Sequence, residues 1–361
     1  MDVHIVPGVK AKDVAEAHRK DLFHQEEHGC KCMTYWIDEQ RENIFCLIEA
    51  PEKEAVEELH RRAHGLIPNK IIEVNNSLVE SFLGRIYDPK DAGINDDGLK
   101  VFNDSSFRIL LVTKTNDPAL LQHKHGIEKA NELLALHNGI IRRNLLHFGG
   151  REAEREGSGF TASFTSASKA VSCALDIQKD IETDAHTLNF KIAIHAGEPV
   201  ERSNTMFGDT IQFANTLCTV AAYNQIAISS SVKELVLKDF FLNNRKNFLT
   251  LSPNDEGLLN LLFNTLEENW QNADFDMNEY CHAVAMSNSQ LYRKTISLTG
   301  LSPNILLKEF RLEKAKELMK KQRYSIAQIT FDTGFTSASY FTKCFKNKYG
   351  LLPMAYLDLL H

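Results

Sequence analysis

Hydrophobic residues recur along the chain with two different periods, and the period predicts where strands and helices lie. Alternating apolar positions predict strands over residues 3–6, 32–37, 44–48 and 71–74, and apolar positions three and four apart predict helices over 11–27 and 52–64. The same reasoning predicts strands over 107–112, 160–164, 190–195 and 225–228, and helices over 119–137, 167–181 and 210–222. From about residue 276 onward the pattern is helical only.

These patterns predict a multidomain α+β protein. The order strand, helix, strand, strand, helix, strand in residues 1–86 fits a ferredoxin-like α/β sandwich. Residues 106–235 alternate strands with helices and predict an α/β layered domain, and residues 272–361 predict an all-α domain. The polar, turn-rich residues 87–105 predict a linker, and residues 236–271, with an apolar helical run over 258–266, predict a connector.

The C-terminal segment repeats itself. Five residues recur fifty positions later: Ser287, Leu291, Arg293, Gly300 and Pro303 become Ser337, Phe341, Lys343, Gly350 and Pro353. Each set describes a helix with a serine N-cap, an apolar anchor, a cation and a glycine stop with a proline beyond it. A shorter helical run and a turn precede each of these helices, with Gly334 in the second turn. The pattern therefore predicts two helix-turn-helix units.

This segment resembles the AraC/XylS family of transcription regulators, and the resemblance covers about the last quarter of the chain. It is carried by residues 287–294, 311–315, Ile329, Gly334-Phe335, Ser339-Tyr340-Phe341, Phe345-Lys346, Gly350, Pro353 and Tyr356. The resemblance implies that double-stranded DNA is the partner. It also implies that two helices read bases, through Ser289, Tyr292 and Arg293 in the first and Ser339, Thr342 and Lys343 in the second.

Two further observations bear on this DNA-binding prediction. Lys294 and Lys346 lie beside the implied base-reading residues at helical spacing, where cations reach phosphates from a major groove. Residues 272–361 carry a net charge of +4, although the whole chain carries −7, so a basic module is attached to an acidic body. Thr295 departs from the family, which usually has a large apolar residue there, and predicts looser packing of the first unit.

The N-terminal segment is rich in potential metal ligands. Six of the fourteen histidines fall in residues 1–86. His60 and His64 are four apart and share one helical face, and with His4 and Cys46 on predicted strands they form a candidate site for nickel, zinc or copper. The alternatives are that the paired histidines are polar surface, or that Cys30 and Cys32 at a strand edge supply a thiolate pair.

Nearly the whole of this segment also resembles a small ferredoxin-like family that includes nickel-binding members. The resemblance is carried by Pro7-Gly8, residues 34–36, residues 45–51, His60, residues 63–66 and residues 72–74. It implies Ni²⁺ as the cofactor and favours His4, Cys46, His60 and His64 as its ligands, with Tyr35 and Glu73 as nearby candidates.

The middle segment resembles the catalytic domain of class III nucleotide cyclases, through residues 157–160, 191–199, 207–210 and Ala214. Those enzymes hold two metal ions with two aspartates, because the triphosphate and the attacking oxygen need divalent charge beside them. At the positions of the two aspartates this chain has Val112 or Thr113 and Ser158. Glu154 replaces the lysine that recognises the base, and Gln212 and Thr216 replace the residues that stabilise the transition state. We therefore expect a degenerate cyclase-like domain that is not an enzyme and that is a candidate for homodimer formation.

No run of eighteen apolar residues and no cationic, apolar leader is visible, and the seven cysteines are scattered. We expect a cytoplasmic protein with no membrane span and no disulfide framework. The sequence as a whole predicts an AraC-type regulator of transcription that responds to nickel or to another small effector. The alternatives are a cyclase-related enzyme and a nickel-binding protein in which DNA binding is secondary.

Overall fold

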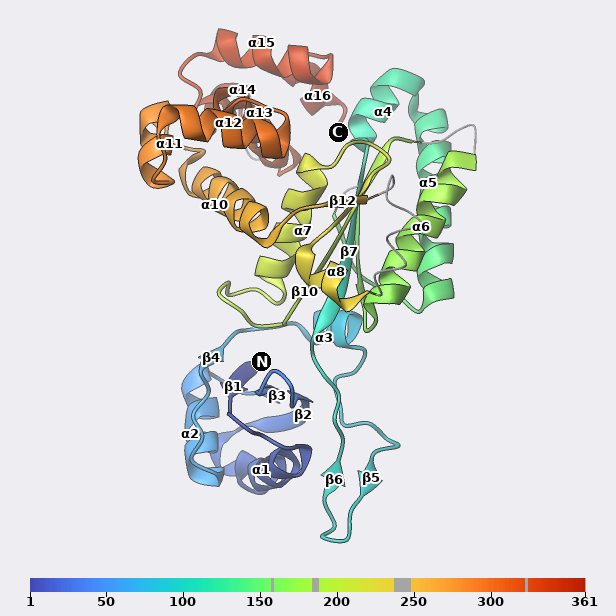
Figure 1. Ribbon diagram of the computed structural model, residues 1–361, viewed down its shortest axis with the longest axis vertical. Coiled ribbons are helices and arrows are strands. Elements are labelled where there is room, and N and C mark those ends of the chain that lie inside the picture. Colours follow the sequence, from blue (N-terminus) through green and yellow to red (C-terminus); the bar gives the residue numbers. More distant parts are fainter. Residues whose placement is uncertain (157–158, 184–187, 237–247, 322–323, 361) are drawn as a thin grey trace.

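The computed structural model describes residues 1–361 except 157–158, 184–187, 237–247, 322–323 and 361. The N-terminal domain and the helical C-terminal domain lie at opposite ends of the molecule, with the sheet of the middle domain between them (Figure 1). Among the described helices, none is both long enough and apolar enough to cross a bilayer.

The N-terminal domain is a four-stranded antiparallel sheet covered by two helices. Its elements are β1 (Asp2–Ile5), α1 (Ala11–His24), β2 (Lys31–Asp38), β3 (Asn43–Glu49), α2 (Lys53–Ala63) and β4 (Lys70–Ile71). The sheet order is β2-β3-β1-β4, the ferredoxin-like arrangement that the strand order predicted. The predicted helix over 11–27 ends at His24 and continues as a 3₁₀ turn, Gln25–His28, and the predicted strand over 71–74 is the shorter β4.

Residues 87–105 do not behave as the free linker that their composition predicted. A short helix, α3 (Asn76–Leu83), comes before them, and they contain a two-stranded hairpin of β5 (Gly93–Ile94) and β6 (Lys100–Val101). Leu99 and Phe102 are buried in the N-terminal core, where Phe102 stacks on Tyr35 with ring centroids 4.1 Å apart. Two apolar residues among polar ones are therefore enough to dock this segment on the sandwich.

The middle domain is a six-stranded mixed sheet with the order β12-β11-β10-β7-β9-β8. Its strands are β7 (Arg108–Thr115), β8 (Arg151–Glu156), β9 (Gly159–Phe164), β10 (Phe190–Gly197), β11 (Ile226–Ile228) and β12 (Phe248–Thr250). Its helices are α4 (Pro118–His125), α5 (Ile127–Phe148), α6 (Ala167–Thr183), α7 (Gly208–Val220) and α8 (Ser230–Leu235). The α/β layering confirms the fold class predicted for this segment.

Three features of the middle domain differ from what its sequence predicts. The predicted helix over 119–137 is two helices separated at Gly126, which has a φ of +81°. β8 was not predicted because its sequence, Arg-Glu-Ala-Glu-Arg-Glu, offers almost no apolar alternation at the sheet edge. β12 lies within the predicted connector, yet it pairs in parallel with β11 and so belongs to the sheet.

Helix α10 (Pro253–Asn269) joins the sheet to the C-terminal helices. Its buried Leu259, Leu262 and Leu266 share one apolar cluster with Phe213 and Leu217 of α7. The same cluster contains residues of the C-terminal domain, among them Tyr280, Leu291 and Leu306. The middle and C-terminal domains therefore share a continuous core.

The C-terminal domain is all helical, as predicted. Its elements are α11 (Met277–Ala283), α12 (Asn288–Thr299), α13 (Pro303–Lys320), α14 (Ile326–Asp332), α15 (Ala338–Tyr349) and α16 (Pro353–Asp358). A second cluster, formed around Phe341, Phe345 and Tyr356, also contains Ala119 of α4. The second helical unit is thus packed on the middle domain through a different helix from the first.

Candidate nucleic-acid interface and metal centre

Helices α12 and α15 begin and end as their sequences predict. The Ser287 hydroxyl accepts a hydrogen bond from the backbone N–H of Gln290, and the Ser287 backbone N–H donates one to the Gln290 side-chain oxygen, which completes a capping box. Ser337 caps α15 in the same way through the N–H of Tyr340. Gly300 and Gly350 end the two helices with positive φ angles of 72° and 83°.

The turns that precede these helices differ by one residue. Residues 284–286 join α11 to the cap at Ser287, and residues 333–336 join α14 to the cap at Ser337. Each turn places its second residue in the left-handed region, Ala285 with φ 52° and Gly334 with φ 74°. A Cβ at Gly334 would lie 2.5 Å from the Trp270 carbonyl oxygen, so only glycine fits the second turn without movement.

All but one of the eight residues predicted to bind DNA are exposed on these two helices. The exception, Thr342, is half-buried. The exposed set comprises Ser289, Tyr292, Arg293, Lys294, Ser339, Lys343 and Lys346. Their anchors, Leu291 and Phe341, are completely buried on the opposite sides of the helices. The polar faces of α12 and α15 therefore point out of the domain.

The cations of the C-terminal domain are of two kinds, those that contact a carboxylate and those that do not. Lys314 of α13 contacts Glu267 at 2.7 Å, and Lys348, on the inner side of α15, contacts Glu309 at 2.9 Å. Across the part of the chain that the structure describes, none of the four cations on the outer faces, Arg293, Lys294, Lys343 and Lys346, has a carboxylate partner. Those cations remain available to an external polyanion.

Thr295 takes the place that Phe345 has in the second unit, and both side chains are fully buried. Within the described residues, the Thr295 hydroxyl finds no hydrogen-bond partner. The first unit therefore carries both a smaller anchor and an unsatisfied polar atom, which agrees with the looser packing expected from the sequence.

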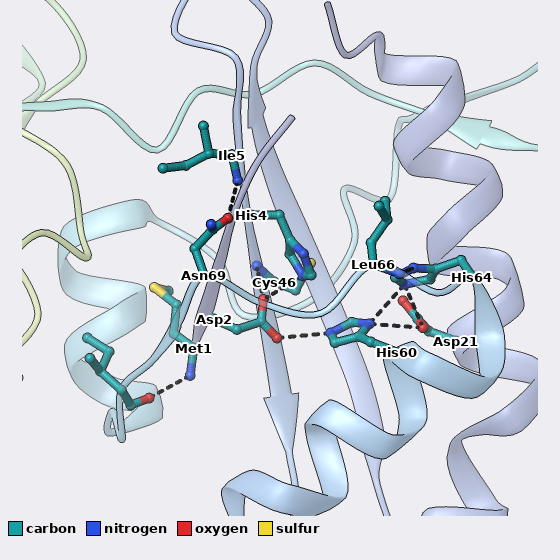
Figure 2. Close-up of polar contacts among 11 residues, drawn as sticks. Met1, Asp2, His4, Ile5, Asp21, Cys46, His60, His64, Leu66 and Asn69 are labelled. Carbon is teal, nitrogen blue, oxygen red and sulfur yellow. Dashed lines mark hydrogen bonds and ion pairs between the residues drawn. The ribbon is translucent and has the colours of Figure 1, made fainter. Parts of the chain in front are cut away.

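The four predicted metal ligands gather in one buried cluster of the N-terminal domain (Figure 2). β1 supplies His4, β3 supplies Cys46, α2 supplies His60, and His64 is the residue that caps the C-terminus of α2. The ring centroids of His4 and His60 are 4.9 Å apart, and His60 Nδ1 lies 2.9 Å from His64 Nε2. Spacing along α2 and the β1–β3 pairing bring these residues together.

Two carboxylates complete the cluster, and sequence reasoning missed both. His60 lies between them, with its Nε2 3.1 Å from Asp2 and its Nδ1 3.2 Å from Asp21 (Figure 2). Potential ligand atoms form two groups, Asp2–His4–Cys46 and Asp21–His60–His64, and lie within 4.8 Å of one another in each. Asp2 was detectable in principle, because it shares a strand face with His4. Asp21 comes from α1, and only the packing of α1 beside α2 reveals it.

Burial and charge set the protonation of this cluster. Burial lowers the pKa of His4 to about 4. Burial also lowers the pKa of His60, but the hydrogen bonds and charges of Asp2 and Asp21 outweigh it and raise that pKa to about 10. Burial raises the pKa of Asp21, yet hydrogen bonds from His60 and His64 bring it down to about 2. The two carboxylates are therefore anionic at neutral pH.

The other candidates from the sequence lie outside both groups. Tyr35 is buried against Phe102, and Glu73 is exposed. Cys30 and Cys32 are not at an exposed edge, because both side chains are buried beside Leu59. Burial raises the pKa of the Cys32 thiol well above its usual value, as it does that of the Cys46 thiol, so the pKa does not distinguish the two.

Comparison with known proteins gives two family matches. Residues 280–358 match a family described as helix-turn-helix domain, and residues 1–74 match one described as nickel responsive protein SCO4226-like. The HTH-type transcriptional regulator MtrA of Neisseria gonorrhoeae is 34% identical over 83 residues, which are 23% of this chain and 28% of MtrA.

Residues 280–358 form an AraC-type helix-turn-helix domain.

Two other similarities complete the comparison. Histidine kinase P4 of Formosa agariphila is 34% identical over 108 residues, which are 30% of this chain and 8% of that protein. This chain thus spans less than a third of the length of either of these relatives. A solved structure of adenylate cyclases from Trypanosoma brucei aligns with 39% of this chain and 77% of that chain, at 15% identity and a TM-score of 0.34.

The AraC-type domain and the SCO4226-like domain are separated by the middle sheet, whose cyclase-like positions have structural roles. Val112 and Thr113 lie buried within β7. The Thr113 hydroxyl accepts a hydrogen bond from the Phe160 backbone, and Gln212 donates one to Asn264. Ser158 lies outside the described residues, as does the side chain of Glu154.

Proposed function

We propose that this chain is a sequence-specific DNA-binding regulator of transcription. The observation that carries the proposal is the pair of capped helices, α12 and α15, whose outer faces hold four cations with no carboxylate partner in the described part of the chain. The AraC-type match over residues 280–358 supports it. In this proposal Ser289, Tyr292, Arg293, Ser339, Thr342 and Lys343 meet base edges, and Lys294 and Lys346 meet phosphates.

We further propose that the N-terminal domain binds a nickel ion and that nickel changes the affinity for DNA. The donor set fits this metal, because imidazole suits nickel, and carboxylate and thiolate groups lie within reach in the same buried cluster. His4, Cys46, His60 and His64 would hold the ion together with Asp2 and Asp21. The match of residues 1–74 to a nickel-responsive family supports this proposal.

The middle domain, in this proposal, transmits or receives a signal and catalyses no reaction. Val112 is an apolar side chain within the sheet, and Thr113 uses its hydroxyl to hold β9. Val112 offers no ligand atom, and the Thr113 hydroxyl lacks the negative charge with which an aspartate holds a metal ion beside a triphosphate. Incubation of the purified chain with ATP or GTP and Mn²⁺ tests this part, and the formation of a cyclic nucleotide would overturn it. Homodimer formation through this domain is a separate expectation, which sedimentation of the purified chain tests.

The central experiment measures DNA affinity with and without the metal. Fluorescence anisotropy of the full chain on the DNA upstream of its own gene is recorded at one salt concentration, with Ni²⁺ and again with a chelator. A change in affinity supports a metal-responsive regulator, because a ligand shifts an equilibrium only if it binds the two states unequally. Tight binding that nickel leaves unchanged would retain the DNA proposal and reject nickel control of affinity.

A substitution ties the metal effect to the cluster. Asp21→Asn keeps the shape of the side chain but removes a charge that contacts both His60 and His64. We expect it to weaken Ni²⁺ binding by roughly tenfold or more, since loss of a group that orients metal ligands typically has that effect. Glu16→Gln, which changes an exposed carboxylate on the same helix, is the matched control. Equal nickel affinity in the two variants, measured by calorimetry, would remove Asp21 from the site.

A further inference from the structure

A second candidate site lies between the N-terminal and middle domains. A cleft of about 880 Å³ opens there, and its walls come from the end of β2, the end of α3, the start of β7 and the start of α6. This volume lies within the range of small-molecule sites, which are often found at domain interfaces. Neither the metal cluster nor the DNA-binding helices contribute to its walls.

Four arginines and three carboxylates line this cleft, and two of the arginines have no carboxylate partner among the described residues. Arg41 contacts Asp38 at 2.7 Å, and Arg85 contacts Asp104 at 3.3 Å. Arg108 is buried and donates to backbone carbonyls only, those of Phe82, Leu83, Ser105 and Phe107. Its positive charge is therefore solvated by carbonyl dipoles and is not neutralised.

Arg151 is the arginine that is free to bind a ligand. Among the described residues it has no hydrogen bond and no ion pair, and its guanidinium lies against Gly84. A Cβ at Gly84 would be 2.8 Å from Arg151 Cζ, so the absence of a side chain at Gly84 makes room for the guanidinium. Burial is the main reason that the pKa of Arg108 is lowered to about 10; the charge of Asp104 opposes this change, and the nearby charges of Arg151 and Arg85 add to it, so like charges lie close together. An anion between the domains would relieve that repulsion.

The start of α6 faces the same cleft. Thr165, Ser166 and Ser168 line it, and α6 is a 17-residue helix that begins at Ala167. The first N–H groups of such a helix have no acceptor within the helix and carry partial positive charge. Arg151 pairs with Ser163 across β8 and β9, only two residues before Thr165, so the guanidinium and the helix start belong to one wall.

Two aromatic side chains also line the cleft, Trp36 and Phe107. Trp36 is fully buried, with the Arg85 guanidinium 4.6 Å from the centre of its ring, and the Arg41 guanidinium lies 3.7 Å above the centre of the Phe107 ring. A ligand that satisfies the whole cleft therefore needs an oxyanion at one end and a flat apolar group at the other. Molecules that combine these two groups include aryl carboxylates and aryl phosphates.

We propose that this cleft binds a small molecule with a carboxylate or phosphate attached to a flat apolar group, whose oxyanion contacts Arg151 and the start of α6. The site is separate from the metal cluster and from the DNA-binding helices. The proposal therefore holds or fails independently of the proposed function.

The chain offers a built-in reporter for the test. It has two tryptophans, Trp36 in the cleft and Trp270 at the end of α10, so Trp270→Phe leaves Trp36 as the sole source of tryptophan fluorescence. The full chain in this background is titrated with phenyl phosphate, benzoate and inorganic phosphate at constant ionic strength. The thermal unfolding midpoint of the chain with its natural tryptophans is measured with the same compounds as a second readout.

We expect saturable binding of phenyl phosphate or benzoate below about 10 mM, tighter than that of inorganic phosphate. Arg151→Met should weaken the binding of phenyl phosphate or benzoate by about tenfold or more, because a charge-assisted hydrogen bond is lost. Arg151→Lys should retain part of that affinity. Arg143→Met, which changes an exposed arginine paired with Asp180 outside the cleft, is the control and should leave it unchanged. Tighter binding of phenyl phosphate assigns the natural ligand to phosphates, and tighter binding of benzoate assigns it to carboxylates.

Two results would overturn the site. One is the absence of saturable binding of any probe by both readouts. The other is equal affinity in the Arg151→Met and Arg143→Met variants, which would place bound phosphate on basic residues elsewhere, such as those of the C-terminal domain.

Discussion

At the scale of single residues, buried polar groups distinguish the two helix-turn-helix units. Thr295 is fully buried and its hydroxyl has no partner among the described residues, whereas the buried Thr330 donates its hydroxyl to the Ile326 carbonyl at 2.8 Å. An unsatisfied buried hydroxyl costs stability, but one that is hydrogen-bonded does not. Two threonines in similar helical settings therefore have opposite energetic consequences.

Thr295→Val is expected to stabilise the C-terminal domain by about 1 kcal/mol, because valine keeps the shape and removes the unsatisfied oxygen. Thr330→Val is the matched control and should give no gain, since it removes a hydroxyl that is hydrogen-bonded. Urea unfolding followed by far-ultraviolet circular dichroism measures both. A lower midpoint for Thr295→Val than for the parent chain would contradict the assignment.

At the scale of elements, the two units repeat their helices but not their turns. The turn before α12 is one residue shorter than the turn before α15, and it holds Ala285 in the left-handed region where the longer turn has Gly334. Gly334 packs against the Trp270 carbonyl, which also accepts a hydrogen bond from Arg311 at 3.0 Å. This contact joins the second unit to the end of α10.

Gly334→Ala is expected to lower the stability of the domain by more than Gly350→Ala. Both positions have positive φ, which costs an L-residue about 1–2 kcal/mol. Only at Gly334 would the new Cβ also meet backbone, 2.5 Å from the Trp270 oxygen, because at Gly350 nothing lies within 4 Å. Thermal unfolding of the two variants provides the comparison, and an equal loss at both sites would show that the contact with Trp270 relaxes freely.

The residues on the outer faces of α12 and α15 predict how DNA affinity depends on salt concentration and on base sequence. Lys346→Ala should weaken binding to all DNA sequences alike and reduce the slope of log affinity against log salt by about 0.9, because one phosphate contact is lost. Arg293→Ala should instead relax base choice at one position, at a cost of about 1–3 kcal/mol on the preferred site. Lys233→Ala, an exposed lysine on α8, is the control. Unchanged slopes and unchanged base preference would reject these assignments.

At the scale of the whole molecule, polar contacts join the three domains. Lys70 of β4 donates to the carbonyls of Glu201, Arg202 and Ser203 at 2.6–3.0 Å, and Asn43 donates to Glu198 at 2.6 Å. At the other side of the sheet, Asp117 contacts Lys320 at 3.3 Å and accepts a hydrogen bond from Tyr356 at 3.0 Å. The proposed metal and DNA sites, at opposite ends of the molecule, are thus connected through packed and hydrogen-bonded elements.

The contact at Asp117 predicts a pH dependence. Burial raises the pKa of Asp117, but the charges of Lys316 and Lys320 outweigh it, so the pKa is lowered. A carboxyl with a lowered pKa contributes stability above its unfolded pKa of about 4 and loses it as pH falls through the folded value. Asp117→Asn should therefore lower the unfolding midpoint at pH 7, and the difference from the parent should shrink below about pH 4. Asp332→Asn, an exposed change on α14, is the control, and a difference that persists at low pH would contradict the charge argument.

Local signals explain why much of the architecture was predictable. Serine caps, glycine stops and the fifty-residue repeat located α12 and α15, because these signals act within one or two helical turns. The spacing of His60 and His64 likewise placed two imidazoles on one face of α2. β8 escaped prediction because an edge strand of alternating Arg and Glu needs no apolar face, and the docking of residues 87–105 escaped because it depends on distant core residues.

The amino-acid sequence by itself determined the fold class, the two helix-turn-helix units and the richness of the N-terminal segment in metal ligands, because caps, period and spacing are local properties. Only the tertiary structure decided that Asp2 and Asp21 join the histidines, that β12 completes the middle sheet, and that four arginines meet at a cleft between domains. Each of these depends on residues far apart in the chain, which the packing of whole elements brings together.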